Sequence, residues 1–310
     1  MHKPPATALT QPVGRHAVIG APYLWLLVFF LLPFLMVLKI SLSDSDGITF
    51  KDLVQVQEGV ATLSLKFGNY LIVAQDALYI DTYLSSLQYA AWTTFFCLLL
   101  GYPFAYFMAR AKATVQPALL MLVMLPFWTS FLLRVYAWKG LLSEGGWAHQ
   151  ALTTLRLDQA LLALGLIPSA GQLLNTPFSL VLGMTYTYLP FMVLPLYATL
   201  SKMDLRLLEA ATDLGATPWV AFWKITVPLS RAGIVAGAML VFIPCVGEYV
   251  IPELLGGPET LMIGRVLWDE FFSNNDWPLA STLAVLMVLL IIVPLALFNK
   301  HQAEASEVRP

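Results

Sequence analysis

The stretch Leu205–Leu229, LRLLEAATDLGATPWVAFWKITVPL, separates two strongly apolar parts of the chain and predicts a helix, a stop and a second helix. Asp204 precedes the first helix and is a favourable capping residue, so we expect this helix to begin at Leu205. Gly215 stands where a helix commonly ends in a left-handed residue. The stretch is therefore predicted to lie as a helix–turn–helix along a membrane face.

The second helix of this stretch is predicted to restart at Thr217 and Pro218, because proline is preorganised for the first helical position. Pro228 ends it before the next apolar run. The side chains that recur at helical spacing between these prolines predict one aromatic face, which we expect to rest on the bilayer. They are Trp219, Phe222, Trp223 and Thr226.

Part of the same stretch resembles the EAA loop of the membrane subunits of ATP-binding-cassette (ABC) importers. The one departure from the family pattern is Val227, where the family more often has Leu. In that family the loop is the coupling helix, which docks in a cleft of the ATP-hydrolysing subunit. The residues that match the loop in spacing are Glu209, Ala210, Ala211, Gly215, Ile225 and Pro228.

Glu209 is the residue from which we expect the strongest effect on coupling. Ala210 and Ala211 leave a slim helix that can enter a groove of a partner. The alternative is a local surface charge cluster, because Arg206 and Asp213 lie within one turn of Glu209. The predicted coupling site consists of Arg206, Glu209, Ala210, Ala211, Asp213 and Gly215.

The composition places the chain in a membrane. Of its 310 residues, 58% are hydrophobic and 12% are charged, and the mean hydropathy is +0.73, whereas about a quarter of the residues of a soluble domain are charged. The formal net charge of −2 gives no sign of a nucleic-acid partner. The histidines are scattered without a pair at ligand spacing, so no metal site is predicted. Cys97 and Cys245 each lie in an apolar run and are predicted to be unpaired core residues.

The apolar runs predict an all-α membrane protein with six transmembrane helices. These spans are expected at 18–40, 82–109, 117–140, 177–201, 232–251 and 277–299. Together they form one membrane domain, 18–299, whose coupling loop is 202–230, and the polar tails are 1–17 and 300–310. The first run is longer than the apolar core of a secretory signal, so we expect an uncleaved first helix.

The Lys and Arg residues of the short loops predict which side of the membrane each loop faces. The opposite side is poorer in these residues and rich in acids. Both termini and the coupling loop are therefore predicted to be cytoplasmic, as the EAA resemblance also implies. The basic residues of this side are Lys3, Arg15, Arg110, Lys112, Lys202, Arg206, Lys224, Arg231, Lys300 and Arg309.

Stretches outside the coupling loop resemble the permeases of polyamine importers, and among these the PotH-type. They are Gly101–Tyr106, Leu125–Thr129, Leu189–Met192 and Trp268–Pro278. The resemblance implies a type I ABC importer permease fold in a bacterial inner membrane, with putrescine favoured over spermidine as cargo.

The partners that the same resemblance implies are two ATPase subunits, a second and related permease subunit, and a periplasmic polyamine-binding protein. The chain has no GxxxxGK[ST] phosphate loop, so we expect it to bind no cofactor itself. ATP-Mg is expected on the ATPase subunits, and membrane lipid around the spans.

Glu248 lies inside the fifth predicted span, where a carboxylate is costly and marks a candidate functional site. The ammonium groups of a polyamine can bind a carboxylate and aromatic faces. The alternative is an intramembrane ion pair, because Arg134 and Glu248 both lie about 25 Å from the cytoplasmic start of their spans. The predicted substrate path consists of Glu248, Tyr249, Trp128, Tyr186 and Tyr188.

Two other transport functions stay open from the sequence. An ABC permease for another small solute would share these features. An ion-coupled secondary transporter would work without a partner ATPase and would need ion ligands near broken helices at the midplane. A membrane-embedded enzyme is not predicted, because the chain shows no paired acids, histidine cluster or nucleophile arrangement.

Overall fold

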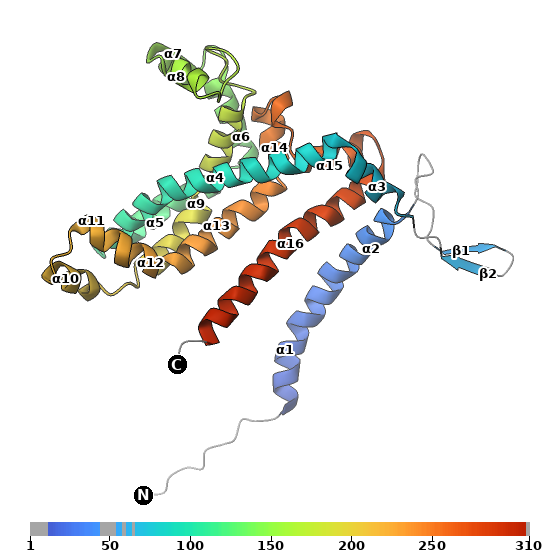
Figure 1. The fold of residues 1–310 in the computed structure, drawn as a ribbon, viewed down its shortest axis with the longest axis horizontal. Helices are drawn as coiled ribbons and strands as arrows, with labels where there is room; N and C mark the ends of the chain where they lie inside the picture. Colours follow the sequence, from blue (N-terminus) through green and yellow to red (C-terminus); the bar gives the residue numbers. More distant parts are fainter. Residues whose placement is uncertain (1–11, 44–53, 58–59, 64–65, 308–310) are drawn as a thin grey trace, which may run out of the picture. The chain divides into compact units, whose positions relative to one another are not determined.

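The computed structural model describes residues 12–43, 54–57, 60–63 and 66–307. This part of the chain is almost entirely helical, which confirms the predicted all-α class, and its two short strands form one hairpin. The chain divides into two compact units, one of residues 1–75 with 270–310 and one of residues 76–269 (Figure 1).

The first unit is built on two apolar helices that lie against each other, α2 (Leu32–Ser41) and α16 (Trp277–Glu307). α2 continues a helical run that starts with α1 and passes through a π turn, η1, and the two strands pair antiparallel with Val54 opposite Leu63. The remaining elements of this part of the chain are α1 (Pro12–Leu26), η1 (Leu27–Leu31), β1 (Val54–Gln57), β2 (Val60–Leu63), α3 (Gly68–Gln75) and η5 (Asp269–Ser273).

Three hydrogen bonds fix the end of α2. The Ser41 hydroxyl bonds Tyr70 Oη at 2.8 Å, and the Ser41 carbonyl accepts from Thr282 Oγ1 at 3.2 Å. The Ser43 carbonyl accepts from Asn69 Nδ2 at 3.2 Å. Side chains of α3 and α16 thus satisfy carbonyls that a helix end leaves without partners.

The second unit has a core of three helices that contact one another, α4 (Ala77–Arg110), α9 (Pro177–Leu200) and α13 (Arg231–Val246). Shorter elements surround this core. In chain order they are α5 (Gln116–Met124), η2 (Leu125–Trp128), α6 (Phe131–Leu142), α7 (Trp147–Thr154), α8 (Leu157–Ala163), α10 (Arg206–Asp213), α11 (Pro218–Ala221), η3 (Phe222–Thr226), α12 (Val227–Leu229), α14 (Val250–Leu255), η4 (Pro258–Thr260) and α15 (Ile263–Trp268).

Glycines bring the three core helices close together around Met192 of α9. A Cβ atom added at Gly237 of α13 would lie 2.7 Å from Met192 Sδ and 3.1 Å from its carbonyl oxygen. A Cβ atom at Gly101 of α4 would lie 3.2 Å from Met192 Cγ. Small residues at such contacts let helix backbones approach closely, as is common between helices in membranes.

Three helices of the described chain are long and apolar enough to cross a membrane: Val18–Ser41, Ala77–Arg110 and Pro177–Leu200. α16 contributes a shorter apolar stretch, Trp277–Ile292. These four stretches fall on the first, second, fourth and sixth predicted spans. The total of six spans stays a prediction.

The third and fifth predicted spans are broken rather than straight. Gln116–Trp128 and Phe131–Leu142 meet at 87°, so the span predicted at 117–140 is not one helix. Pro218–Leu229 and Arg231–Val246 meet at 64°, and α13 ends before the predicted boundary of 251.

Two of the π turns, η1 and η3, occupy the same position relative to a proline that follows them. η1 ends two residues before Pro33, and η3 ends two residues before Pro228. A proline ring clashes with the carbonyl four residues earlier, which here lies inside the π turn. Because a π turn holds an extra residue, it moves that carbonyl away and lets the chain stay helical through the proline.

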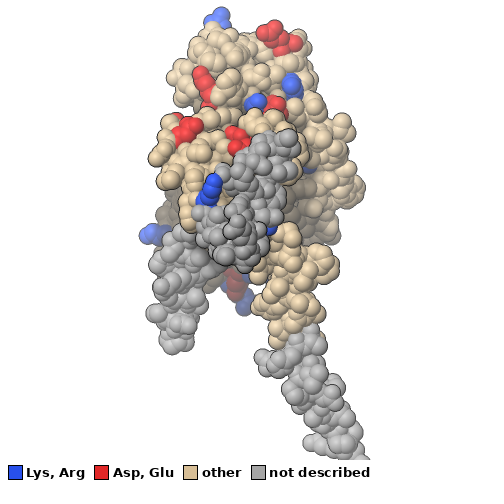
Figure 2. Space-filling view, turned by 90° about the vertical axis from the view of Figure 1, so that its right-hand side faces the viewer, with Lys and Arg blue, Asp and Glu red and all other residues tan. Residues whose placement is uncertain are grey.

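Charged side chains are sparse on the described surface that Figure 2 draws, where most atoms belong to other residues. Large apolar side chains are exposed all along the first helix, with Trp25 64% and Phe30 64% accessible. Such a surface suits the hydrocarbon core of a bilayer.

The contact between α13 and α9 can be tested by enlarging Gly237. We expect Gly237→Val to lower the free energy of unfolding by about 1–3 kcal/mol, because its side chain would overlap Met192. Thermal unfolding of the detergent-purified protein measures this change. Ala236→Val, at an exposed neighbouring position, is the matched control, and equal melting temperatures for the two variants would contradict the packing.

Candidate functional site

The coupling segment, Asp204–Ser230, begins with α10, and its ends form as the sequence predicts. Asp204 Oδ1 accepts a hydrogen bond from the Arg206 amide at 3.0 Å. At the other end the Gly215 amide bonds the Thr212 carbonyl and the Ala216 amide bonds the Ala211 carbonyl, both at 2.9 Å. This pair of bonds is a Schellman motif, and Gly215 has the left-handed φ of +83° that it requires.

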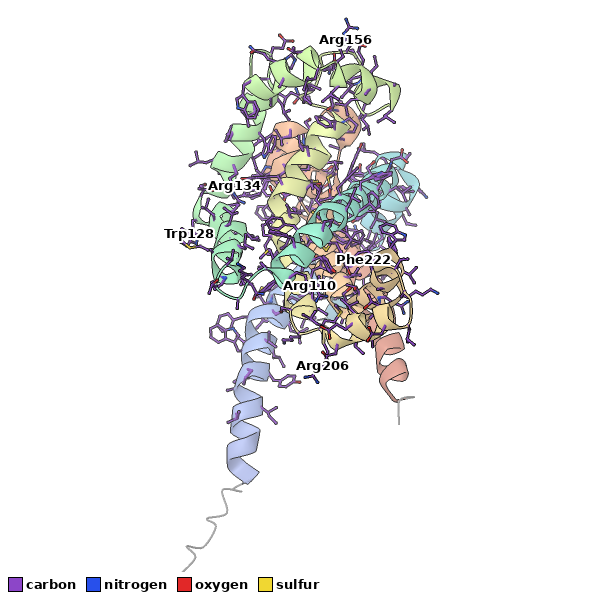
Figure 3. The ribbon with its side chains drawn as sticks, turned by 90° about the vertical axis from the view of Figure 1, so that its left-hand side faces the viewer. Arg110, Trp128, Arg134, Arg156, Arg206 and Phe222 are labelled. Carbon is purple, nitrogen blue, oxygen red and sulfur yellow. The ribbon has the colours of Figure 1, made fainter. Side chains whose placement is uncertain are left out.

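The residues predicted to meet an ATPase divide between two faces of α10. Arg206, Glu209, Ala210 and Asp213 are exposed, whereas the side chain of Ala211 is buried. Among the described residues, Glu209 makes no salt bridge with Arg206, although both are exposed on α10. Figure 3 shows Arg206 at one end of the second unit and Arg156, which precedes α8, at the opposite end.

The second half of the coupling segment differs from the prediction. Thr217 Oγ1 accepts from the Val220 amide at 3.3 Å and starts α11, as expected. The chain then enters the π turn η3 instead of continuing as a regular α-helix. The rings of Trp219, Phe222 and Trp223 still contact one another, at centroid distances of 6.3, 5.7 and 5.3 Å, so the aromatic cluster forms as predicted. Trp219 and Trp223 are exposed, whereas Phe222 packs on α4 and Thr226 is fully buried.

Glu248 lies between α13 and α14, where the helix is interrupted. Its Oε1 accepts from the amides of Tyr249 at 3.2 Å and Val250 at 3.0 Å. Its Oε2 accepts from the hydroxyl of Tyr188, on α9, at 2.5 Å. The carboxylate therefore caps α14 and ties it to α9, and its negative charge stands at a break between two helices.

The aromatic residues of the predicted substrate path do not all gather at Glu248. Tyr188 bonds it, and Tyr249 adjoins it with its ring stacked on Trp268 at 4.7 Å. Tyr186 instead packs edge-on against Trp138 at 5.5 Å. Trp128 is 73% exposed, and Figure 3 shows it projecting away from the helices.

Trp268 is the residue at this site that the sequence prediction missed. Trp268 is the last residue of α15, and its ring stacks parallel on the ring of Tyr249, which directly precedes α14. The stacked rings therefore connect the start of α14 to the end of α15. No local pattern announces a contact between these two helices. Arg265 of the same helix pairs with Glu253 of α14 at 2.6 Å.

Arg134 is not paired with Glu248 in this structure. Its guanidinium lies over the rings of Phe127 at 5.7 Å and Phe131 at 5.9 Å. Its Nε and Nη1 atoms are buried without a hydrogen-bond partner in the described chain. The predicted ion pair between Arg134 and Glu248 depends on both residues lying at the same depth in straight spans. The third predicted span bends by 87° just before α6, which carries Arg134, so their depths cannot be compared in this way.

No group of His, Cys, Asp and Glu residues that could hold a metal ion occurs in the described part of the chain. Cys97 and Cys245 are free and buried, as predicted. The features at hand are an exposed amphipathic helix, a proline-linked π turn and a carboxylate at a helix break.

Comparison with known proteins identifies the class. Residues 17–305 match the family of binding-protein-dependent transport system inner membrane components, so the chain belongs to that family. It is thus a permease subunit of an ABC importer in the inner membrane, which works with ATP on partner ATPase subunits. This membership excludes the secondary-transporter and enzyme alternatives.

The relatives in this family narrow the comparison. The chain is 37% identical over 97% of its length to the spermidine/putrescine transport system permease protein PotB of Salmonella typhimurium (strain LT2), covering 99% of that protein. It is 38% identical over 87% of its length to PotB of Escherichia coli (strain K12), covering 92% of it. These relatives correct the PotH-type resemblance to PotB. The molybdenum transport system permease ModB of Azotobacter vinelandii is 30% identical over 71% of the chain and 93% of its own.

A solved structure shares the fold. A bacterial ABC transporter involved in the import of the polysaccharide alginate matches with a TM-score of 0.61 at 16% identity, covering 96% of this chain and 99% of that one. The same transporter type has been seen with an alginate-bound periplasmic protein. The type I ABC importer permease fold is therefore confirmed.

The left-handed stop of α10 can be tested at Gly215. No atom lies within 4 Å of a Cβ placed there, so a substitution meets only a conformational cost. We expect Gly215→Val to destabilise the stop by about 1–2 kcal/mol. The matched variant Gly215→Asn tolerates this conformation better. Hydrogen–deuterium exchange of peptides that cover α10 should be faster in the Val variant, and equal exchange would contradict the account.

Proposed function

We propose that this chain is the permease subunit through which an inner-membrane ABC importer moves polyamines, putrescine or spermidine, into the cell. The observation that carries the proposal is the identity of 37% with PotB, a spermidine/putrescine permease, over 97% of the chain. The carboxylate of Glu248 at a helix break, with tyrosines beside it, suits a cationic cargo better than an anionic one.

The complete transporter is proposed to contain two ATPase subunits, a second and related permease subunit, and a periplasmic polyamine-binding protein. ATP-Mg would bind to the ATPase subunits, and this chain would hold no cofactor of its own. The absence of a GxxxxGK[ST] phosphate loop from the sequence supports this division of labour.

The proposed topology has six spans, with both termini and the coupling loop, residues 202–230, in the cytoplasm. Figures 1 and 3 support opposite sides for the coupling segment and the α7–α8 hairpin, because the two lie at opposite ends of the second unit. Arg110 ends α4, and both Arg110 and Arg206 belong to the basic side that the positive-inside rule assigns to the cytoplasm.

Coupling to ATP hydrolysis is proposed to run through α10. Ala210 lies about one turn from the exposed apolar residues Leu207, 47% accessible, and Leu214, 89% accessible, and Glu209 is exposed on another face of the same helix. An amphipathic helix with exposed leucines and an unpaired carboxylate fits a groove in another protein.

Removing the Glu209 carboxylate tests this role. We expect Glu209→Ala to lower uptake about tenfold, because loss of a desolvated charge at an interface costs about 1.4 kcal/mol or more. The protein should still reach the membrane, since Glu209 makes no contact that the fold needs. Glu144→Ala, at an exposed acid between α6 and α7, is the control. Uptake that falls equally in both variants would argue against the role.

The substrate path is proposed to pass Glu248, where one carboxylate both caps α14 and faces a cation. Glu248→Gln separates the two roles, because its amide oxygen can still accept the Tyr249 and Val250 amides. We expect the variant to fold but to lose most polyamine uptake and polyamine-stimulated ATP hydrolysis. Glu259→Gln, at an exposed position, is the control. Normal uptake by Glu248→Gln would leave Glu248 with the capping role alone.

The cargo itself is tested by reconstitution. The permease pair with its ATPases and binding protein is placed in proteoliposomes, and uptake of labelled putrescine, spermidine and molybdate is compared. The proposal expects ATP-dependent uptake of a polyamine and none of molybdate. Molybdate is included because the relative ModB is a molybdenum transport permease, which represents the second candidate function, transport of another small solute. Uptake of molybdate without polyamine uptake would favour it.

A further inference from the structure

Phe222 stands between the coupling segment and α4. It is the first residue of the π turn, and its ring meets the rings of Tyr102 and Tyr106 edge-on, at centroid distances of 5.6 Å and 5.8 Å. Both tyrosines belong to α4, one turn apart. Figure 3 shows Phe222 beside the end of α4 that Arg110 marks.

A second contact joins the same helix to the other end of the π-turn region. The Tyr102 hydroxyl bonds the hydroxyl of Ser230 at 2.8 Å, and Ser230 is buried. Ser230 is the joint at which Pro218–Leu229 and α13 meet at 64°. α4 therefore contacts the coupling segment at the first residue of the π turn and again at Ser230, on the two sides of α12.

The contact of Phe222 with α4 could transmit movement of α10 to a helix that is not its neighbour along the chain. Along the backbone, α10 is joined to α9, which ends at Leu200, and through the 64° joint to α13, but not to α4. Across Phe222, such movement reaches α4 directly, and from there α9, because Gly101 adjoins Tyr102 and packs on Met192. The guanidinium of Arg110, also on α4, lies 5.1 Å from the centre of the Tyr106 ring. The Tyr106 ring therefore contacts both Phe222 and Arg110.

We propose that Phe222 is a positioning residue, an aromatic latch that makes the coupling segment and α4 move as one body during transport. This inference rests on the proposed coupling role of α10. It assigns no contact with substrate or nucleotide to Phe222. The neighbouring Trp223 belongs to the same π turn and its ring contacts Phe222 at 5.3 Å, but it is 53% exposed and no described ring contact joins it to α4, so it is not expected to share this role.

A distance measurement tests the latch without reference to the cargo. Spin labels are attached at Phe107→Cys on α4 and Thr212→Cys on α10, both exposed positions, in the complete transporter in nanodiscs. Cys97 and Cys245 are buried, and protein without added cysteines reports any labelling of them. Distances are recorded without nucleotide and after trapping with ATP and vanadate.

The latch predicts one narrow distance distribution that is the same in both states, and a broader, state-dependent distribution when Phe222→Ala is added. Trp223→Ala should behave as the parent does. A distance in the parent that changes between the states, or a Phe222→Ala variant that matches the parent, would overturn the latch.

Transport measurements separate the latch from the proposed function. With Phe222→Ala we expect polyamine uptake to fall about tenfold, through the loss of two edge-to-face ring contacts, while the ATPase subunits still copurify and hydrolyse ATP. Phe222→Tyr, which keeps the ring, should restore uptake, and Phe222→Leu should not. Absence of polyamine uptake by the parent would contradict the proposed cargo, whereas the distance measurement would still decide the latch.

Discussion

Hydrocarbon offers the free amides and carbonyls of an interrupted helix no hydrogen-bond partners, and this constraint accounts for the structure at Glu248 and at Pro33. Hydrocarbon cannot satisfy free amides and carbonyls, so broken helices persist only where the protein supplies partners. At the break after α13, the Glu248 carboxylate takes the amides of Tyr249 and Val250 and is itself held by Tyr188. At Pro33, inside the first apolar helix, a π turn moves the carbonyl that the ring would strike, and the coupling segment uses the same π turn before Pro228.

The second unit consists of a core of three closely packed helices and two bends that lie outside this core. Its straight part is the contact of α4, α9 and α13, in which glycines let the backbones approach around Met192. Its bends lie outside that contact, before α6 and between α12 and α13. The coupling segment joins the second bend, and Phe222 and Ser230 attach it to α4. In the proposed transporter, these contacts would pass a movement of α10 to whole helices of the core.

Local structure was predictable from the sequence where short-range chemistry decides it. Asp204, Gly215 and Thr217 cap or stop helices through neighbours within a few residues, and the structure bears out all three. The aromatic cluster of Trp219, Phe222 and Trp223 also forms, but the π turn and the packing of Phe222 on α4 depend on tertiary contacts that a regular 3.6-residue period does not predict. The ion pair between Arg134 and Glu248 is predicted from equal depths in two straight helices. That prediction does not hold because the helix before Arg134 bends by 87°. Contacts such as Tyr249 with Trp268 depend on distant packing that no local pattern records.

The most direct test of the central claim asks which end of this subunit touches the ATPase. A photoreactive amino acid is placed at Leu207 on α10 or, as the matched control, at Leu164, an exposed leucine that follows α8 at the opposite end of the unit. The assembled transporter is then irradiated in the membrane. The account predicts an adduct between the permease and the ATPase subunit from position 207 and none from position 164. An ATPase adduct from position 164, or from neither position, would contradict it.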